Sequence, residues 1–346
     1  MAHIAILGAG YMGSALTVPA TDNGHSVALW GTPLDGRLLA ALRAGRRHPR
    51  LGLRLPRAVV PFAAEALRAA LAGADLVVNA VTSDAAVSVL RQAAPHVPAG
   101  VPVLSVSKGL TRSRGRIVTL STAVLEATGL RIVTVGGPSK AMELARRVPT
   151  AVMYASPDAR ARSRWRRALG TPYYAITETA DQRGLELCSA LKNAYAIAVG
   201  LCDGLVAAGR ADAMYNTKSL IYTQALAEIA RLGRRVGARP ETVYGLGGAG
   251  DLHVTAVAGR NRIFGELRGA GVPTREVVAR LAARDELTEG YPAIRWCWRF
   301  ATQHGARDLP VLRALYRIVY QGRDVATELY AACSTAPHAT SRGGRP

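Results

Sequence analysis

Short apolar runs alternate with amphipathic stretches through the first half of this 346-residue chain. HIAIL (3–7) and SVALW (26–30) have the length and apolar content of buried strands, and stretches such as EALRAALAG have the spacing of helices. Strands that alternate with helices predict an α/β fold with a doubly wound, mostly parallel sheet. Further strand-like runs lie at 58–60 and 75–81, and the alternation continues as far as Ser139.

The pattern changes at about Asp181, where apolar residues begin to recur at spacings of three and four over long stretches. This spacing is typical of helices, so we expect an all-helical domain over residues 181–330, after an α/β domain over residues 1–180. Within the first domain, residues 31–57 form a polar segment rich in turn residues, and its part RRHPRLGLRLPR (46–57) is too basic and proline-bounded for a core element. Residues 331–346 have the composition of an unstructured tail.

The composition places the chain among globular proteins, with 49% hydrophobic and 20% charged residues. No uninterrupted apolar run reaches the roughly 18 residues that a membrane span needs, and the first residues do not resemble a secretion signal. The four cysteines are too scattered for a disulfide framework or a zinc site, so we expect buried, reduced thiols and no metal. Together these features favour a cytoplasmic protein without a membrane span.

The formal net charge of +20 at pH 7 raises the question of a nucleic-acid partner. However, the arginines are spread along the chain, and aromatic residues, which would stack on bases, make up only 5%. Because bulk charge is a weak functional signal, we expect no specific nucleic-acid binding. A small anionic substrate would suit the same sign of charge.

A glycine-rich turn, GAGYMG, follows the first predicted strand directly and leads into a helix. Gly8 would allow the tight turn, Gly10 would let the backbone approach a pyrophosphate, and Gly13 would permit close helix–strand packing. Tyr11 and Met12 complete this turn at the positive end of the helix. The motif in this setting predicts a Rossmann domain that binds a dinucleotide.

The cofactor is expected to be NAD or NADP, with NADP slightly favoured. A ribose-binding acid would normally end the second strand, but the chain has Trp30, Gly31 and Thr32 there. The missing acid leaves room for a 2′-phosphate. Asp35 lies close enough in the sequence to reverse this preference, and Arg37 lies beside it.

Beyond the glycine turn, several motifs follow in order, and with them the chain resembles the NAD(P)-dependent glycerol-3-phosphate dehydrogenase family from about residue 3 to about residue 325. The motifs are LKNAYAIAVGLCDGL, NTKSLI, GLGGAGDLHVTA and GRNRIFGELRGAG. The resemblance implies a Rossmann domain, a helical domain, and a site in the cleft between them. The implied reaction is reversible hydride transfer between NAD(P)H and the central carbon of dihydroxyacetone phosphate.

The resemblance also implies roles for individual residues, carried over motif by motif. Lys192 matches the general acid–base lysine of the family's LKN motif, and Lys108, Asp251 and Thr255 complete the implied catalytic set. The implied substrate-binding residues are Lys108, Asn193, Gly137, Ser139, Arg260 and Asn261, with the last two holding the phosphate. The implied cofactor-binding residues are Gly8, Gly10, Tyr11, Met12, Gly13, Lys108, Ala141, Arg260 and Glu289.

The chemistry explains why a lysine is needed. Only four of the 44 lysine and arginine residues are lysines, and arginine cannot exchange a proton near neutrality. A ketone that receives a hydride also needs a proton at its oxygen, and a lysine can supply it if desolvation or a nearby cation lowers its pKa. Lys192, with Lys108 as its neighbouring cation and Asp251 to orient the ammonium, fits this role.

Simpler interpretations remain open for the same residues. Lys192 could extend from its helix to water, Lys108 could be solvated at a strand end, and Asp251 could be a helix N-cap. Lys218, in NTKSLI, has no role derivable from the residues, and a structural ion pair is at least as plausible.

Departures from the family pattern leave the substrate open. Lys140 stands where an aromatic ring is usual, Met12 also differs, and Asn79 and Thr82 are more polar than their counterparts. A dehydrogenase of the same scaffold could act on another phosphorylated hydroxy compound or on a keto acid. A different class of function is cofactor binding without catalysis. A homodimer is the expected assembly.

Overall fold

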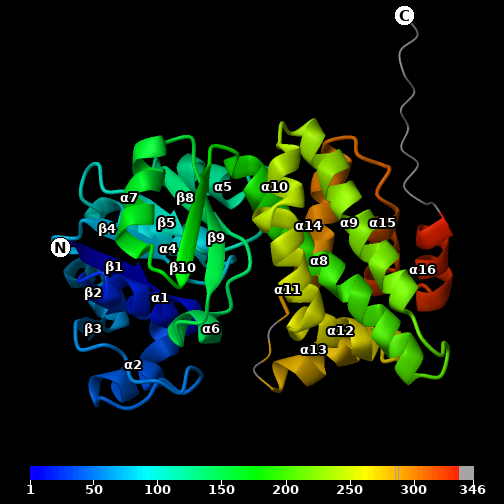
Figure 1. Cartoon of the computed structure of the whole chain (residues 1–346), viewed down its shortest axis with the longest axis horizontal. Coiled ribbons are helices and arrows are strands. Elements are labelled where there is room, and N and C mark those ends of the chain that lie inside the picture. Colours follow the sequence, from blue (N-terminus) through cyan, green and yellow to red (C-terminus); the bar gives the residue numbers. More distant parts are fainter. Residues whose placement is uncertain (285, 287, 335–346) are drawn as a thin grey trace, which may run out of the picture. The chain divides into compact units, whose positions relative to one another are not determined.

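The computed structural model describes residues 1–284, 286 and 288–334, and its chain divides into two compact units (Figure 1). The first unit comprises Met1–Ser189 together with Glu241–Asp251, and the second comprises Ala190–Pro240 together with Leu252–Pro346. The domain boundary at residue 180 stays a prediction; the two compact units change over after Ser189 and again on either side of Glu241–Asp251. Helix α8 (Gln182–Ala207) spans the first of these changes, because its first two turns belong to the first unit and its remainder to the second.

An eight-stranded sheet in the order β10-β9-β8-β5-β4-β1-β2-β3 forms the centre of the first unit. Every neighbouring pair is parallel except β8 and β9, so the predicted doubly wound, mostly parallel sheet is confirmed. The strands are β1 (His3–Leu7), β2 (Ser26–Trp30), β3 (Val59–Phe62), β4 (Leu76–Asn79), β5 (Val103–Ser105), β8 (Ile132–Gly136), β9 (Thr150–Ala155) and β10 (Tyr174–Thr179). A separate antiparallel hairpin consists of β6 (Leu110–Ser113) and β7 (Arg116–Thr119).

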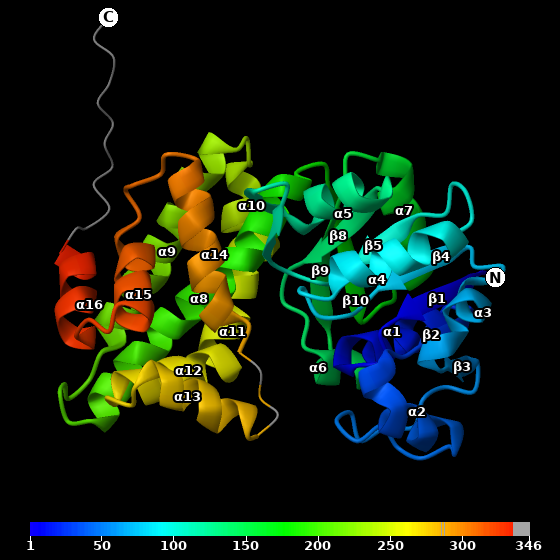
Figure 2. The ribbon, with the colours of Figure 1, turned by 180° about the vertical axis from the view of Figure 1, so that it is seen from behind.

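Helices cover both faces of this sheet (Figures 1 and 2). Alternate residues of β1 belong to two different cores: Ile4 and Ile6 pack with α1 and α7, while Ala5 and Leu7 pack with α3 and α4. This two-sided burial explains why the strands are apolar throughout rather than alternating. The covering helices are α1 (Tyr11–Asp22), α2 (Gly36–Arg43), α3 (Leu67–Leu71), α4 (Ala86–Ala93), α5 (Leu120–Thr128), α6 (Ala141–Ala145) and α7 (Ala159–Leu169).

Helix α2 differs from one expectation, because residues 31–57 were expected to be a polar segment rich in turns. Residues Gly36–Arg43 form a helix there, and Leu39 and Leu42 bury their side chains in the core of the first unit. The helix was not anticipated because its eight residues lie within a segment in which arginines, glycines and prolines dominate the pattern.

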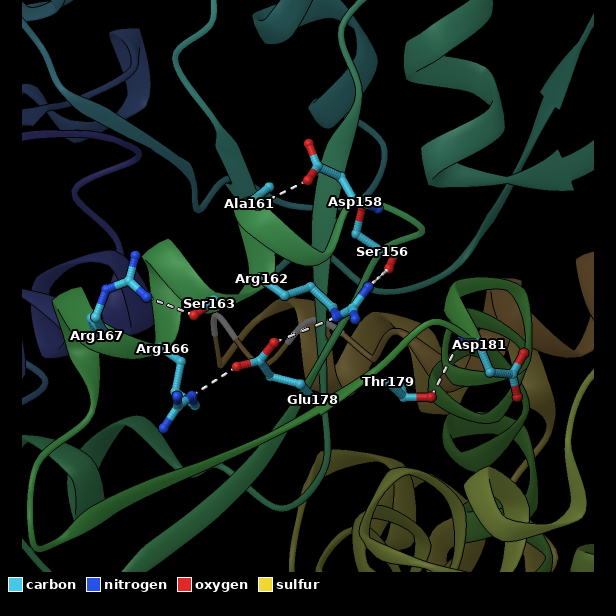
Figure 3. Close-up of polar contacts among 10 residues, drawn as sticks. All are labelled: Ser156, Asp158, Ala161, Arg162, Ser163, Arg166, Arg167, Glu178, Thr179 and Asp181. Atoms are coloured by element: carbon cyan, nitrogen blue, oxygen red, sulfur yellow. Dashed lines mark hydrogen bonds and ion pairs between the residues drawn. The ribbon is translucent and has the colours of Figure 1, made fainter.

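Helix α7 carries five arginines in 11 residues, so positive charge is more concentrated here than expected. Trp165 is fully buried and anchors the helix, and the Asp158 carboxylate accepts a backbone N–H of its first turn at 3.0 Å. Glu178 on β10 forms ion pairs with Arg166 at 2.7 Å and Arg162 at 3.5 Å (Figure 3). Part of the charge on α7 is therefore paired within the unit. The absence of specific nucleic-acid binding stays a prediction.

The second unit is built from helices (Figure 2). They are the later turns of α8, α9 (Tyr215–Arg235), α11 (Asp251–Val257), α12 (Arg260–Gly269), α13 (Thr274–Ala282), α14 (Gly290–Gln303), α15 (Pro310–Tyr320) and α16 (Val325–Ser334). Two short elements connect α9 to α11: α10 (Pro240–Tyr244) and a single π-helical turn, η4 (Leu246–Gly250). The predicted helical C-terminal region is confirmed. Helix α16 continues to Ser334, four residues into the expected tail, and 335–346 lie outside the described residues.

Helix α8 contains no uninterrupted apolar run of 18 residues, as expected, but its overall composition invites comparison with a membrane span. In the part of the chain that the structure describes, this one helix is long and apolar enough by length and composition alone. However, 83% of its most apolar 18-residue window is buried within the structure, as in the core helix of a soluble protein. Three of the four cysteines, Cys188, Cys202 and Cys297, are buried and form no disulfide, as expected.

Two buried glutamates cap helices that have no side-chain cap of their own. Glu186 on α8 accepts the backbone N–H of Ser121 at 2.8 Å, in the first turn of α5. Glu228 on α9 is fully buried and accepts the N–H groups of Val311 at 2.7 Å and Leu312 at 3.1 Å, in the first turn of α15. Because the first N–H groups of a helix lack partners within it, these carboxylates satisfy donors that would otherwise be buried unpaired.

Burial raises the pKa of Glu228 from 4.5 to about 7, although its hydrogen bonds oppose the shift. The folded protein therefore holds a proton that the unfolded chain releases at lower pH. The resulting stabilisation is fully present below the unfolded pKa near 4.5 and is lost as the pH rises through about 7. We expect the wild type to lose stability relative to Glu228→Gln over this range, by up to about 1.4 kcal/mol per pH unit.

Urea unfolding of both proteins at several pH values between these limits would measure this loss. The amide that replaces the carboxyl group in the variant cannot titrate, so the difference between the two unfolding free energies isolates the Glu228 proton. Parallel pH profiles for the two proteins would contradict the prediction.

Candidate functional site

The turn between β1 and α1 has a backbone geometry that explains its glycines. Gly8 has a φ angle of +118°, where glycine is favoured, and a methyl group there would lie 2.7 Å from the carbonyl oxygen of Ala80. A methyl group at Gly13 would overlap the carbonyl oxygen of Gly8. At Gly10, by contrast, no atom lies within 4 Å of an added methyl group. Two glycines are thus required by internal packing, and the third leaves an open approach to the backbone.

The start of α1 suits an anionic ligand. Its N-cap, Gly10, provides no side-chain cap, so the first backbone N–H groups of the helix keep their capacity to donate. The positive end of the helix dipole adds attraction for a phosphate. Tyr11 is 37% exposed beside this turn, whereas Met12 packs against the core. The residues present therefore fit the pyrophosphate of a dinucleotide.

The end of β2 shows how Asp35 is used. Its Oδ2 atom accepts both the backbone N–H and the hydroxyl of Thr32, each at 2.8 Å. This carboxylate oxygen is therefore occupied within its own turn. Arg37 is exposed in the first turn of α2, close to Thr32 in the sequence.

Lys108, Gly137 and Asp251 come together in the first unit, although they are far apart in the sequence. Lys108 Nζ lies 2.8 Å from Asp251 Oδ2 and 3.3 Å from the carbonyl oxygen of Gly137. The backbone N–H of Gly137 donates to the same Asp251 oxygen at 3.2 Å. The side chains of Lys108 and Asp251 are 17% and 1% exposed. Lys108 is therefore not a solvated strand-end residue but the partner of a buried carboxylate.

The π-helical turn η4 directly precedes Asp251 and places its carboxylate beside Lys108. A methyl group at Gly248 would overlap the carbonyl oxygen of Val243, so the tight turn needs a glycine there. Single π-helical turns occur frequently at functional sites. Asp251 is the first residue of α11, yet the side-chain bonds described above join it to Lys108 and Gly137, 143 and 114 positions away. A purely local N-cap does not account for these bonds.

Lys192 lies on α8 and is 8% exposed, so its side chain does not extend into water. Its Nζ atom donates to the hydroxyl of Thr255 on α11 at 3.2 Å. Asp251 and Thr255 are four residues apart on α11, a spacing that puts them on the same helix face. Both belong to the predicted catalytic set.

Three polar residues of the second unit form a connected network. Asn261 Nδ2 donates to Asn193 Oδ1 at 3.0 Å, and Asn193 Nδ2 donates to Glu289 Oε2 at 3.1 Å. The backbone N–H of Gly290 donates to Asn261 Oδ1 at 2.9 Å. Glu289 was predicted to bind the cofactor. In the structure its carboxylate accepts a hydrogen bond from Asn193. The two asparagines are 5% and 8% exposed, so the network fixes their orientation.

The remaining predicted residues occupy the ends of short elements. Arg260 is exposed as the first residue of α12, and no hydrogen bond or ion pair of its side chain is found within the described residues. Ser139 is half-buried in the turn between β8 and α6, and Ala141 is the buried first residue of α6. An exposed guanidinium at a helix start is placed to receive an anion.

Lys218 forms an ion pair, which was one of the roles considered for it from the sequence. Its Nζ atom contacts Asp203 Oδ1, and Arg262 Nε donates to Asp203 Oδ2 at 2.8 Å. Asp203 and Arg262 were not among the residues predicted from the sequence. A signal was present, since both lie inside the motifs LCDGL and GRNRIF that carry the family resemblance.

Two family descriptions match most of the chain. Residues 3–162 match the N-terminus of NAD-dependent glycerol-3-phosphate dehydrogenase, and residues 181–330 match its C-terminus. The NADP(+)-dependent glycerol-3-phosphate dehydrogenase of Archaeoglobus fulgidus is 37% identical over 331 residues, which cover 94% of this chain and 98% of that protein. The NAD(P)+ glycerol-3-phosphate dehydrogenase of Geobacter metallireducens is 34% identical over 92% of this chain and 93% of its own length.

A solved structure agrees with these matches. The glycerol-3-phosphate dehydrogenase of Coxiella burnetii superposes with a TM-score of 0.84 at 28% identity, covering 95% of this chain and 98% of that one. The agreement includes residues of both compact units.

Proposed function

The chain belongs to the NAD-dependent glycerol-3-phosphate dehydrogenase family, and from this premise we propose how its residues share the reaction. It is an oxidoreductase that uses NAD or NADP, and its substrate pair is glycerol 3-phosphate and dihydroxyacetone phosphate. The alternative of a keto acid or another hydroxy compound is not favoured. When bound, the nicotinamide supplies or accepts the hydride.

Lys192 is the general acid–base of the proposal. During reduction its ammonium donates a proton to the substrate oxygen as negative charge develops there, and during oxidation the amine takes that proton back. The observation that carries this assignment is a buried lysine amine held at 3.2 Å by the hydroxyl of Thr255. The hydroxyl orients the amine, and burial keeps competing water away from it.

Lys108 and Asp251 are proposed to stabilise the negative charge that develops on the substrate. Asp251 holds the Lys108 ammonium in one position, where its charge can stabilise a developing alkoxide. Asp251 and Thr255 lie on one face of α11, and each of them is hydrogen-bonded to one of the two lysines.

Arg260 and Asn261 are proposed to hold the substrate phosphate. A guanidinium presents a planar pair of N–H donors that matches two phosphate oxygens. Asn261 is kept in place by Asn193 and by the N–H of Gly290. Ser139 and Gly137 are proposed to contact the remainder of the substrate, with Ala141 and Glu289 contributing to cofactor binding.

For the cofactor, the proposal favours NADP over NAD. One oxygen of Asp35 is occupied by Thr32, so this carboxylate is poorly placed to hold a ribose hydroxyl pair. The exposed Arg37 offers a cation for a 2′-phosphate. The relative from Archaeoglobus fulgidus is named as NADP(+)-dependent, which supports this preference.

Kinetics with a panel of substrates and both cofactors test the function. We expect the purified protein to oxidise NADPH, and NADH less efficiently, when dihydroxyacetone phosphate is supplied. Pyruvate and ketopantoate, which carry carboxylates instead of a phosphate, serve as controls and should give no turnover. Turnover on a keto acid without turnover on dihydroxyacetone phosphate would overturn the proposal. A cytoplasmic location and a homodimer stay predictions.

A further inference from the structure

One aspartate of the second unit is held by two cations, and none of the three residues takes part in the proposed reaction. Lys218 engages Asp203 Oδ1, and Arg262 Nε donates to Asp203 Oδ2 at 2.8 Å. The three side chains are 15% (Asp203), 29% (Lys218) and 34% (Arg262) exposed. A carboxylate with both oxygens engaged by charged donors has little freedom to reorient.

This cluster lies close to the proposed substrate residues along two helices. Asp203 follows Lys192 on α8 by about three helical turns, so both residues lie on nearly the same face of that helix. Arg262 lies in the first turn of α12, two residues after Arg260. The carboxylate therefore ties the helix of the general acid–base to the first turn of the proposed phosphate-binding helix.

The contact between these helices is made by glycines. Methyl groups at Gly200 and Gly204 of α8 would overlap the carbonyl oxygens of Arg262 and Glu266, and a methyl group at Gly265 of α12 would overlap that of Ile197. The two backbones thus touch directly. Glycines contribute no side chains to this contact, so they fix how close the helices lie without themselves preventing one helix from sliding or turning on the other.

Side-chain hydrogen bonds at the first turn of α12 restrain the sliding and turning that the glycine contact does not prevent. Asn261 is bonded to Asn193, and Arg262 is bonded to Asp203, so two successive residues of α12 are tied to α8 at different points. Arg260 precedes them directly. Its backbone position is therefore set by these two ties.

We propose that Asp203, held by Lys218, is a positioning residue that fixes the first turn of α12 so that Arg260 meets the substrate phosphate. The inference rests on the proposed function and deepens it, because it assigns a role to Lys218, which the reaction itself does not use. Lys218 engages one carboxylate oxygen and leaves the other for Arg262. Neither Asp203 nor Lys218 touches the substrate.

The test is steady-state kinetics of Asp203→Asn and Lys218→Met with glycerol 3-phosphate. We expect KM to rise roughly 10- to 100-fold in Asp203→Asn, the range for a misplaced binding group, with a smaller rise in Lys218→Met. The kcat value should stay within about twofold, since proton transfer by Lys192 is untouched. The inhibition constant of inorganic phosphate, competing with the substrate, should rise in parallel with KM. Lys218→Arg should restore most of the affinity, because it keeps the cation beside Asp203.

Asp308→Asn is the matched control, because Asp308 pairs with an arginine of the same unit at 3.5 Å but is not part of α8 or α12. It should leave KM unchanged.

A purely structural role would lower the melting temperature of Asp203→Asn and Lys218→Met without moving KM or the phosphate inhibition constant, and this result would overturn the inference. An inactive wild type in the same assay would instead overturn the proposed function. If Asp203→Asn fails to fold, Lys218→Met and Lys218→Arg decide the question, because Lys218 is more exposed.

Discussion

Replacement of Lys192 by methionine should lower kcat for dihydroxyacetone phosphate by about 10²- to 10⁴-fold, the usual contribution of a positioned general acid–base group. Methionine is unbranched and similar in length, so it can occupy the buried position of Lys192 without a cavity or a buried charge. The variant should therefore stay folded and bind NADPH with wild-type affinity. Stopped-flow or steady-state rates, together with NADPH fluorescence titration, would measure both properties.

Two further variants of the same residue identify the cause of the loss. Lys192→Arg keeps the positive charge but cannot release a proton near neutrality, so it should be as inactive as the methionine variant. Lys192→Ala should regain part of its turnover when methylamine is added, because a free amine can take the place of the missing group. An active Lys192→Arg enzyme would show that Lys192 contributes only charge.

Removal of the guanidinium in Arg260→Ala should reduce kcat/KM for dihydroxyacetone phosphate by roughly 30- to 150-fold, which corresponds to about 2–3 kcal/mol for hydrogen bonds to a charged group. The loss should appear mainly in KM, since the phosphate is bound equally before and during hydride transfer. With dihydroxyacetone, which has no phosphate, the wild type and the variant should differ little. The loss in kcat/KM with the phosphorylated substrate, divided by the loss with dihydroxyacetone, measures the contribution of the phosphate contact.

Arg280→Ala is the matched control for this change. Arg280 is an exposed arginine on α13 that pairs with Glu276 on the same helix, and its removal should leave both substrates unaffected. Equal losses on the phosphorylated and the phosphate-free substrate would refute a phosphate-binding role for Arg260.

Much of the fold could be predicted because its elements have strong local patterns. Apart from the polar first residue of each strand, β1 and β2 are apolar, since both of their faces are buried, and a glycine follows each strand directly. Helix α2 was missed because it is only eight residues long and lies in a segment rich in arginine, glycine and proline. Helix α8 was identified as a helix from its spacing; its length and composition alone would suit a membrane span, and it is the burial of 83% of its most apolar window that resembles a core helix.

The candidate site could be predicted only through motifs, because no local pattern reveals contacts between distant residues. Lys108 and Asp251 are 143 positions apart, and only the fold brings their side chains to 2.8 Å. The bond from Asn193 to Glu289 was not anticipated, since an exposed glutamate at the start of a helix has many possible partners. The role of Asp203 depends on the packing of α8 against α12, which the glycine spacing alone does not specify.

The two capping glutamates have a consequence for how the protein assembles. The first turn of α15 is satisfied by Glu228, 83 positions earlier in the chain, and that of α5 by Glu186, 65 positions later. Neither helix can complete its own hydrogen bonding in isolation, so their starts become stable only after remote segments have docked. Secondary and tertiary structure must then form together, and a fragment that lacks α9 is expected to fray at the beginning of α15. Such interdependence makes unfolding cooperative, with these helices melting as part of their units rather than one by one.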